Sequence, residues 1–167
     1  EYLEQNCYTQ TGISYTSKLT GNVLDLDLNI YIKAAGNYKV TVLLLQDRVF
    51  GAPQLKSDGS RQNYAHYNVV RMALTDVLGD DCSTTEHNQI VNKKFNVSIP
   101  SEYDKGNMRI LVYVQRPYES QPDIEGKRYG SYYVDNCVSG KLGADMQLVL
   151  CKNISGGGNE DIIPKED

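Results

Sequence analysis

The feature that most constrains this chain is a strict alternation of apolar and polar residues over residues 24–32. The aliphatic residues of this run are Leu24, Leu26, Leu28, Ile30 and Ile32. Asp25, Asp27 and Asn29 lie between them. A period of two places all five aliphatic side chains on one face of a β-strand, whereas residues two apart on a helix point in nearly opposite directions. The run therefore predicts a half-buried strand.

A second alternating run follows at residues 38–45, and Gly36-Asn37 stands between the two runs. Glycine and asparagine are typical of a tight two-residue turn, so we predict that the two runs form a β-hairpin. Leu43 and Leu45 add apolar residues to the second face of this run. A strand that is apolar on both faces is expected in the centre of a sheet.

The same alternation returns in residues 91–99 and 108–115. The residues Asp104-Lys105-Gly106-Asn107 between them are turn formers. We therefore predict a second hairpin, with a longer loop than the first.

Weaker strand patterns lie at residues 13–19, 132–138 and 146–151, and the segment 64–78 is compatible with a helix or a strand. Because the other segments are β, we favour a strand there. The sequence predicts an all-β fold of about seven or eight strands, an antiparallel two-sheet β-sandwich that is immunoglobulin-like in general architecture.

The 167 residues are enough for one domain with its own core. We assign the β-sandwich domain to residues 1–154. Residues 155–167 begin with three glycines and become acidic, and we expect a flexible C-terminal tail.

The formal net charge of -4 is unlike the basic excess of proteins that bind nucleic acid by neutralising phosphates, so no nucleic-acid partner is expected. No run reaches the roughly 18 apolar residues of a membrane-spanning helix. The chain starts with Glu1 and shows no signal sequence, which is typical of a processed product or an excised domain. We therefore expect membrane attachment only through an anchor outside this chain.

The four cysteines are widely spaced, without a Cys-x-x-Cys pair or zinc-ligand spacing, so neither thioredoxin-like exchange nor a zinc site is expected. They are Cys7, Cys82, Cys137 and Cys151. They allow two disulfides in three connectivities, and Cys137 and Cys151 are possible cross-strand neighbours. Four buried thiols are the alternative.

Two groups of polar residues were considered for chemistry. A candidate polar cluster consists of Asp47, Gln54, His66, Asn68 and Arg71. We favour a structural hydrogen-bond network for this cluster over a binding site. The acidic segment 80–87 lacks the spaced oxygen ligands and the glycine of a calcium loop, and we expect a solvated loop. With no nucleophile motif or phosphate-binding glycine loop, the sequence predicts no enzymatic activity, no cofactor and no metal site.

Tyrosine is the dominant aromatic residue, with 13 copies against 2 Phe and no Trp. Five tyrosines flank the Pro- and Gly-containing segment 116–130: Tyr113, Tyr118, Tyr129, Tyr132 and Tyr133. Exposed tyrosines supply contact area at a low entropic cost, so these residues are a candidate surface for a protein or glycan. Packing within the sheets is the alternative, which we favour.

Between Asn37 and Gly140 the chain resembles the outer-membrane-protein-28-related family of Gram-negative envelope proteins. The similar residues include the strand Tyr38-Lys39-Val40-Thr41-Val42-Leu43-Leu44-Leu45-Gln46-Asp47, then Gln54, and the motif Tyr64-Ala65-His66-Tyr67-Asn68-Val69-Val70-Arg71. Val112-Tyr113-Val114 and Val134-Asp135-Asn136 are similar as well. The motif departs from the family pattern at Tyr67, which separates the histidine from the asparagine.

The resemblance implies an all-β domain in a bacterial outer-membrane or secreted protein, one that often follows a thioredoxin-like domain in the same polypeptide. It implies no catalytic residues. We therefore expect a non-enzymatic interaction or scaffold domain for adhesion or ligand capture, whose partner is a protein or glycan at the cell surface. The alternatives are an accessory domain for an upstream redox domain and a glycan-binding module.

Overall fold

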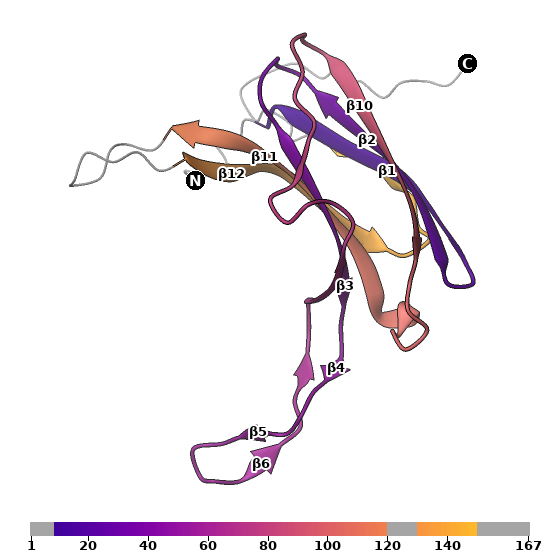
Figure 1. Ribbon diagram of the computed structural model, residues 1–167, viewed down its shortest axis with the longest axis vertical. Helices are drawn as coiled ribbons and strands as arrows, with labels where there is room; N and C mark the ends of the chain where they lie inside the picture. The colour runs from indigo at the N-terminus through magenta and orange to yellow at the C-terminus, as the bar shows by residue number, and fades with distance from the viewer. Residues whose placement is uncertain (1–8, 120–129, 150–167) are drawn as a thin grey trace, which may run out of the picture.

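The protein is a sandwich of two antiparallel β-sheets with a long arm, as the computed structural model shows (Figure 1). The structure describes residues 9–119 and 130–149. The four-stranded sheet consists, in order, of β10 (Gln89–Ser98), β2 (Val23–Ile32), β1 (Thr11–Thr20) and β13 (Met146–Val149). The five-stranded sheet consists of β12 (Gly130–Lys141), β11 (Met108–Glu119), β3 (Lys39–Gln46) and β8 (Val69–Ala73), with β9 (Asp80–Asp81) also paired to β3. The predicted all-β sandwich is thus confirmed, with nine strands in its two sheets.

The core lies between the two sheets and is built from the alternating aliphatic residues. The five aliphatic side chains of β2 are all buried, as are Val40, Val42 and Leu44 of β3. Ile110, Val112 and Val114 complete the facing row on β11. Each set lies on one face of its strand, as the period of two requires. The sequence therefore predicted correctly which face of β2, β3 and β11 is buried.

The first predicted hairpin is wrong. β2 pairs with β1 and β10, whereas β3 pairs with β11, β8 and β9 in the other sheet. The chain crosses between the sheets at Gly36, which bridges to Thr84. Both strands carry a continuous row of aliphatic residues, and these rows stabilise the fold by facing each other across the core instead of lying side by side.

The second predicted hairpin is wrong for the same reason. β10 pairs with β2, and β11 pairs with β3 and β12. The turn residues between them form a short 3₁₀ helix, η1 (Lys105–Asn107), capped by the Asp104 side chain. This connection therefore joins the two sheets, although its local turn chemistry is as expected.

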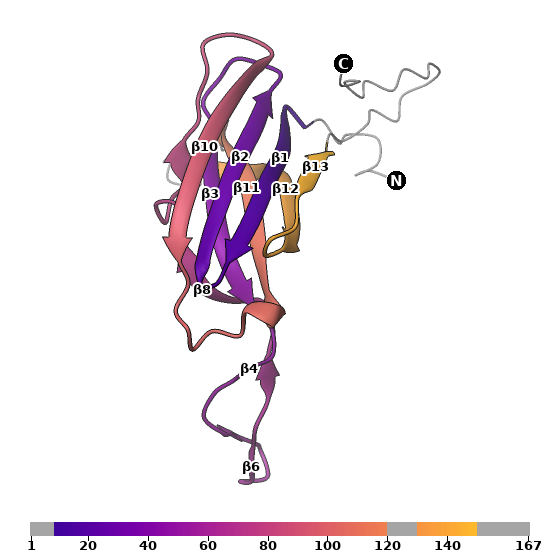
Figure 2. The same ribbon diagram turned by 90° about the vertical axis from the view of Figure 1, so that its right-hand side faces the viewer.

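The longest excursion from the sandwich is an arm, defined here as residues 48–67, between β3 and β8. It contains β4 (Val49–Phe50) paired with β7 (Ala65–His66), and β5 (Gln54–Leu55) paired with β6 (Arg61–Gln62). The arm projects away from both sheets (Figure 1, Figure 2). The ambiguous segment 64–78 thus begins as a strand of the arm and returns to the sandwich as β8.

A buried carboxylate joins the start of β1 to the opposite sheet. Asp135 Oδ2 on β12 accepts hydrogen bonds from the Thr11 hydroxyl at 2.7 Å and the Gln10 backbone N–H at 2.9 Å. Arg116 Nε lies 3.1 Å from the other oxygen of the same carboxylate. Asp135 is the extra residue of a bulge in β12, because Asn136 pairs with Val114 and Val134 pairs with Gln115. The bulge turns its side chain inward, where it ties the two layers together.

Candidate interaction surface

The outer face of the four-stranded sheet is polar. On this face Asp25, Asp27 and Asn29 of β2 lie beside polar residues of the two neighbouring strands, β1 and β10. Lys94 Nζ is 2.8 Å from Asp27, and the Asn92 side-chain amide donates to the same carboxylate. Asn96 likewise donates to Asp25. These cross-strand pairs satisfy the carboxylates within the sheet and make this face a well-solvated surface.

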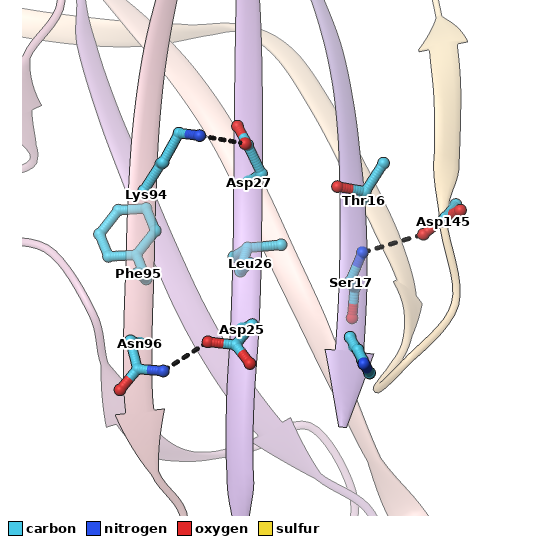
Figure 3. A pocket seen from close by; sticks show the side chains of 10 residues that line it. Thr16, Ser17, Asp25, Leu26, Asp27, Lys94, Phe95, Asn96 and Asp145 are labelled. Atoms are coloured by element: carbon cyan, nitrogen blue, oxygen red, sulfur yellow. Dashed lines mark hydrogen bonds and ion pairs between the residues drawn. The ribbon is translucent and has the colours of Figure 1, made fainter. Parts of the chain in front are cut away.

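A shallow groove crosses this polar face, and Figure 3 shows its lining side chains. Its carboxylates point at neighbouring strands: Asp145 accepts a hydrogen bond from the Ser17 backbone N–H at 2.9 Å. Hydrogen bonds from Lys94 and Asn92 hold the pKa of Asp27 below its ordinary value. The three carboxylates of the groove, Asp25, Asp27 and Asp145, thus already accept hydrogen bonds from groups of the neighbouring strands.

The outer face of the five-stranded sheet instead carries apolar residues at its centre, with Lys39, Arg109 and Gln115 on the same face around them. Leu43 and Leu45 alternate with the core residues of β3, and Leu111 lies beside Leu43 on β11. Val70 of β8 pairs with Leu45 and is 54% exposed. A groove on this face is lined by Leu43, Leu45, Asn68, Val70, Arg109, Leu111 and Ser139. We call this surface the apolar face.

Two of the five candidate tyrosines extend the apolar face. Tyr113 pairs with Thr41 and Cys137, on the side of β11 opposite the buried valines. Tyr132 is exposed, and Lys39 Nζ lies 5.5 Å from the centre of its ring.

Of the other three candidate tyrosines, Tyr133 is the one whose side chain lies in the described part of the chain. The ring of Tyr133 packs against the Arg116 guanidinium, 4.7 Å from its centre. Tyr118 is placed by its backbone in β11, and Tyr129 lies outside the described residues. Tyr113 and Tyr132 thus lie beside the leucines of the apolar face, and the five-tyrosine surface as a whole stays a prediction.

The arm exposes large apolar side chains beyond the sandwich. Phe50 is 62% exposed, Leu55 68% and Tyr67 60%, and Tyr64 is exposed as well. None of these residues belongs to the hydrophobic core as far as the described residues go. A two-stranded ribbon without a core is marginally stable in water, so the contacts at the base of the arm matter for its placement.

The base of the arm is held by a carboxylate. Asp47 Oδ1 accepts the Asn68 backbone N–H at 2.7 Å, and Asp47 Oδ2 lies 2.5 Å from Arg109 Nη1. Arg48 and Asn68 both adopt a left-handed backbone, with φ of 57° and 56°. Asparagine tolerates this conformation, whereas arginine adopts it at an energetic cost. The chain therefore bends sharply in both strands at the base of the arm, and the bend at Arg48 is strained.

The candidate polar cluster separates into three places in the structure. Asp47 and Asn68 form the base of the arm just described. Gln54 and His66 face each other within the arm, with their side-chain nitrogens 3.3 Å apart. Arg71 lies apart from the other four residues and stacks on Tyr103, with its guanidinium carbon 3.9 Å from the ring centre. Sequence reasoning missed Arg109, whose role depends on a strand that lies far along the chain.

The described cysteines are free thiols. Cys82 is buried, and burial raises the pKa of its thiol to about 12. Cys137 is an exposed free thiol. Cys7 and Cys151 lie outside the described residues, and with them the possible pairing of Cys137 with Cys151. Burial also raises the pKa of the Cys137 thiol.

Within residues 9–119 and 130–149, no three His, Cys, Asp or Glu side chains are grouped closely enough to hold a metal ion. In the same part of the chain, no helix has the length and apolar character needed to cross a membrane.

Comparisons with known proteins agree with this fold. Among solved structures, the chain is similar to HBP35 of Porphyromonas gingivalis, with a TM-score of 0.54 and 16% sequence identity. The similarity covers 90% of this chain and 48% of HBP35, so the chain spans about half of that protein's length. No curated protein matches the chain. Residues 2–121 match the family described as outer membrane protein Omp28, and the chain therefore belongs to the Omp28 family of outer membrane proteins.

Proposed function

We propose that this domain is a non-enzymatic interaction domain of a cell-surface outer membrane protein, and that it docks other protein through the apolar face and the arm. The observation that carries the proposal is the contrast between the two outer faces of one sandwich. One face bears paired Asp, Asn and Lys side chains. The centre of the other bears Leu43, Leu111, the exposed Val70 and Tyr113, bordered by Arg109 and Lys39. An apolar, contiguous surface of this kind is typical of a protein–protein interaction site.

The environment of the reactive side chains supports a non-enzymatic role. His66 lies on the arm beside Gln54, with their side-chain nitrogens 3.3 Å apart. The Cys82 thiol is shielded from solvent, and burial raises its pKa to about 12, so it is neutral at physiological pH. A neutral thiol is a weak nucleophile, because the thiolate is the reactive form. These side chains fit structural roles better than catalytic ones.

The proposal is tested by photo-cross-linking on intact bacteria that display the full-length protein. A photoreactive phenylalanine derivative replaces Tyr113 on the apolar face or, as the matched control, Asn29 on the outer face of β2. The proposal predicts protein adducts with the probe at position 113 and not at position 29. Equal labelling at the two positions, or no protein adduct at position 113, contradicts it.

A glycan array separates this proposal from the glycan-binding alternative. We expect no glycan signal that depends on the apolar face, because its side chains offer few hydrogen-bonding groups to sugar hydroxyls. A specific glycan signal that Leu111→Lys abolishes contradicts docking of protein at this face.

A further inference from the structure

The two ends of the five-stranded sheet carry opposite charge. At one end, the arm has the basic residues Arg48, Lys56 and Arg61 against one carboxylate, Asp58, which gives it a formal charge of +2. At the other end, residues 74–88 carry four acidic residues and no Lys or Arg. We call this segment the acidic loop; its acidic residues are Asp76, Asp80, Asp81 and Glu86.

Hydrogen bonds and strand pairing place the acidic loop along the first half of β3, from Val42 to Lys39, and the arm follows the other end of the strand. The acidic loop is anchored where Asp81 pairs with Lys39, the first residue of β3. The arm begins just after Gln46, the last residue of the same strand. In Figure 2 the arm leaves one end of the sandwich, and the chain enters β10 from the acidic loop at the other end. The apolar face lies between the two charged ends.

We propose that a second copy of this chain covers the apolar face, in a two-fold dimer with the β3 strands of the two copies antiparallel. The proposal rests on the proposed function, since it names the partner of the same surface. In such a dimer the arm of each copy lies against the acidic loop of the other. Because a two-fold axis repeats every contact, the dimer forms two such arm–loop contacts.

The geometry of the strand supports this arrangement. β3 has eight residues and is about 27 Å long at ~3.4 Å per residue. Overlaying two antiparallel copies of this strand places Gln46 of one copy near Lys39 of the other. The arm then starts at the position where the partner copy presents its acidic loop, without any change in the arm's direction.

The apolar side chains of the two ends are complementary as well. The acidic loop exposes Val77 (83%) and Leu78 (71%), and the arm exposes Phe50 and Tyr67. Contacts between these residues would remove both sets from water, while the surrounding charges of opposite sign attract. A closed dimer also uses the apolar face, which a head-to-tail filament through the charged ends alone would leave exposed.

A first experiment measures the molar mass of the full 167-residue chain by analytical ultracentrifugation over a concentration series. The proposal predicts a dimer for the wild-type protein and a monomer for Leu111→Lys on the apolar face. Asn29→Lys on the polar outer face is the matched control and should remain dimeric. Circular dichroism establishes that each variant is folded. A wild-type protein that stays monomeric up to about 1 mM overturns the proposal.

A second experiment reverses the charges at each end. One variant carries Lys56→Glu and Arg61→Glu in the arm, and the other carries Asp81→Lys and Glu86→Lys in the acidic loop. Asp80 is left unchanged because it pairs with Lys93 at 3.6 Å within the fold. The arm variant sets an arm of formal charge -2 against a loop of -4 at both contacts, and the loop variant leaves an arm of +2 against a neutral loop. The first variant replaces attraction by repulsion and the second removes the attraction, so each dimer should dissociate at least about tenfold more readily than that of the wild type.

In a heterodimer of the two variants, one arm–loop contact keeps the native charges, and at the other the glutamates introduced in the arm lie against the lysines introduced in the loop. The proposal therefore predicts a 1:1 heterodimer in the mixture that is tighter than the homodimer of either variant. Two variants that each dimerise like the wild type, or a mixture that stays monomeric, overturn it. Adducts of the probe at position 113 with a different protein, together with a monomeric wild type, refute this dimer while the proposed function stands.

Discussion

The carboxylate of Asp47 bonds the backbone N–H of Asn68 across the base of the arm, with 2.7 Å between oxygen and nitrogen. The same carboxylate contacts Arg109 on the neighbouring strand β11. One side chain thus fixes both strands of the arm to the sandwich. The direction of the arm, and with it the proposed contact surface, depends on this residue.

Replacing Asp47 with alanine should therefore loosen the arm. We expect Asp47→Ala to lower the free energy of unfolding by about 1–2 kcal/mol, because it removes a charge-assisted hydrogen bond and an ion pair of partly buried groups. Urea denaturation measures this change, and trypsin should cleave the arm faster after Lys56 and Arg61. The control is Asp58→Ala at the tip of the arm, expected to cost less than about 0.5 kcal/mol. Equal effects of the two substitutions would contradict the role given to Asp47.

A close contact in the core gives a second prediction. A methyl group at Gly140 would meet the hydroxyl of Tyr15, which is buried and has no hydrogen-bond partner among the described residues. Gly140→Ala should therefore cost about 1–3 kcal/mol of stability through overpacking. Tyr15→Phe removes the obstructing oxygen, and the next ring atom is 3.6 Å from the added carbon.

The double variant Gly140→Ala/Tyr15→Phe tests this explanation. It should be more stable than the sum of the two single substitutions indicates, because the clash exists only when both the methyl and the hydroxyl are present. Thermal unfolding of the four proteins gives the coupling. Strict additivity would show that the glycine is required for another reason.

The two described thiols should differ strongly in reactivity. Cys82 is 2% exposed and its pKa is raised to about 12, whereas Cys137 is exposed on β12. Because alkylation requires an accessible thiolate, iodoacetamide near pH 8 should modify Cys137 in the folded protein and leave Cys82 largely unmodified. Peptide mass spectrometry follows each site separately. In denaturant the two rates should converge, and a native Cys82 that reacts as fast as Cys137 would refute its burial.

The polar outer face predicts a pH dependence. The pKa of Asp27 is lowered in the folded protein by hydrogen bonds from Lys94 and Asn92. A carboxylate with a lowered folded pKa stabilises the fold above its ordinary pKa of about 4, and this contribution disappears as the pH falls through the folded value. Asp27→Asn should therefore flatten the loss of stability at acidic pH. Urea unfolding at several pH values measures the slope, and NMR titration of Asp27 reports the pKa directly. An unshifted Asp27 would rule out this source of acid sensitivity.

The alternation of apolar and polar residues predicted the positions of the strands better than it predicted which strands pair. Leu24 and Val42 were both correctly placed on inward faces, because a period of two is a property of a single strand. The two predicted hairpins failed because alternation does not say whether neighbouring runs pair or face each other across the core. Gly36-Asn37 looks like a tight turn in isolation, yet it belongs to a crossing between sheets.

The candidate surface was only partly visible in the sequence. Leu43 and Leu45 revealed a strand that is apolar on both faces, but not that only one of these faces is covered by the other sheet. Arg109 could not be assigned to Asp47, because the two residues are separated by 62 positions. Such pairs form only when distant strands are brought into register.

By itself, the sequence determined that the chain is built of strands, which side of each strand is buried, and where polar residues keep a face in water. These are local consequences of alternation along an extended backbone. Only the tertiary structure decided which strands are neighbours, that residues 48–67 leave the sandwich as an arm, and that one outer face is apolar. Strand pairing joins residues far apart in the chain, so its outcome depends on how all the aliphatic rows pack together at once.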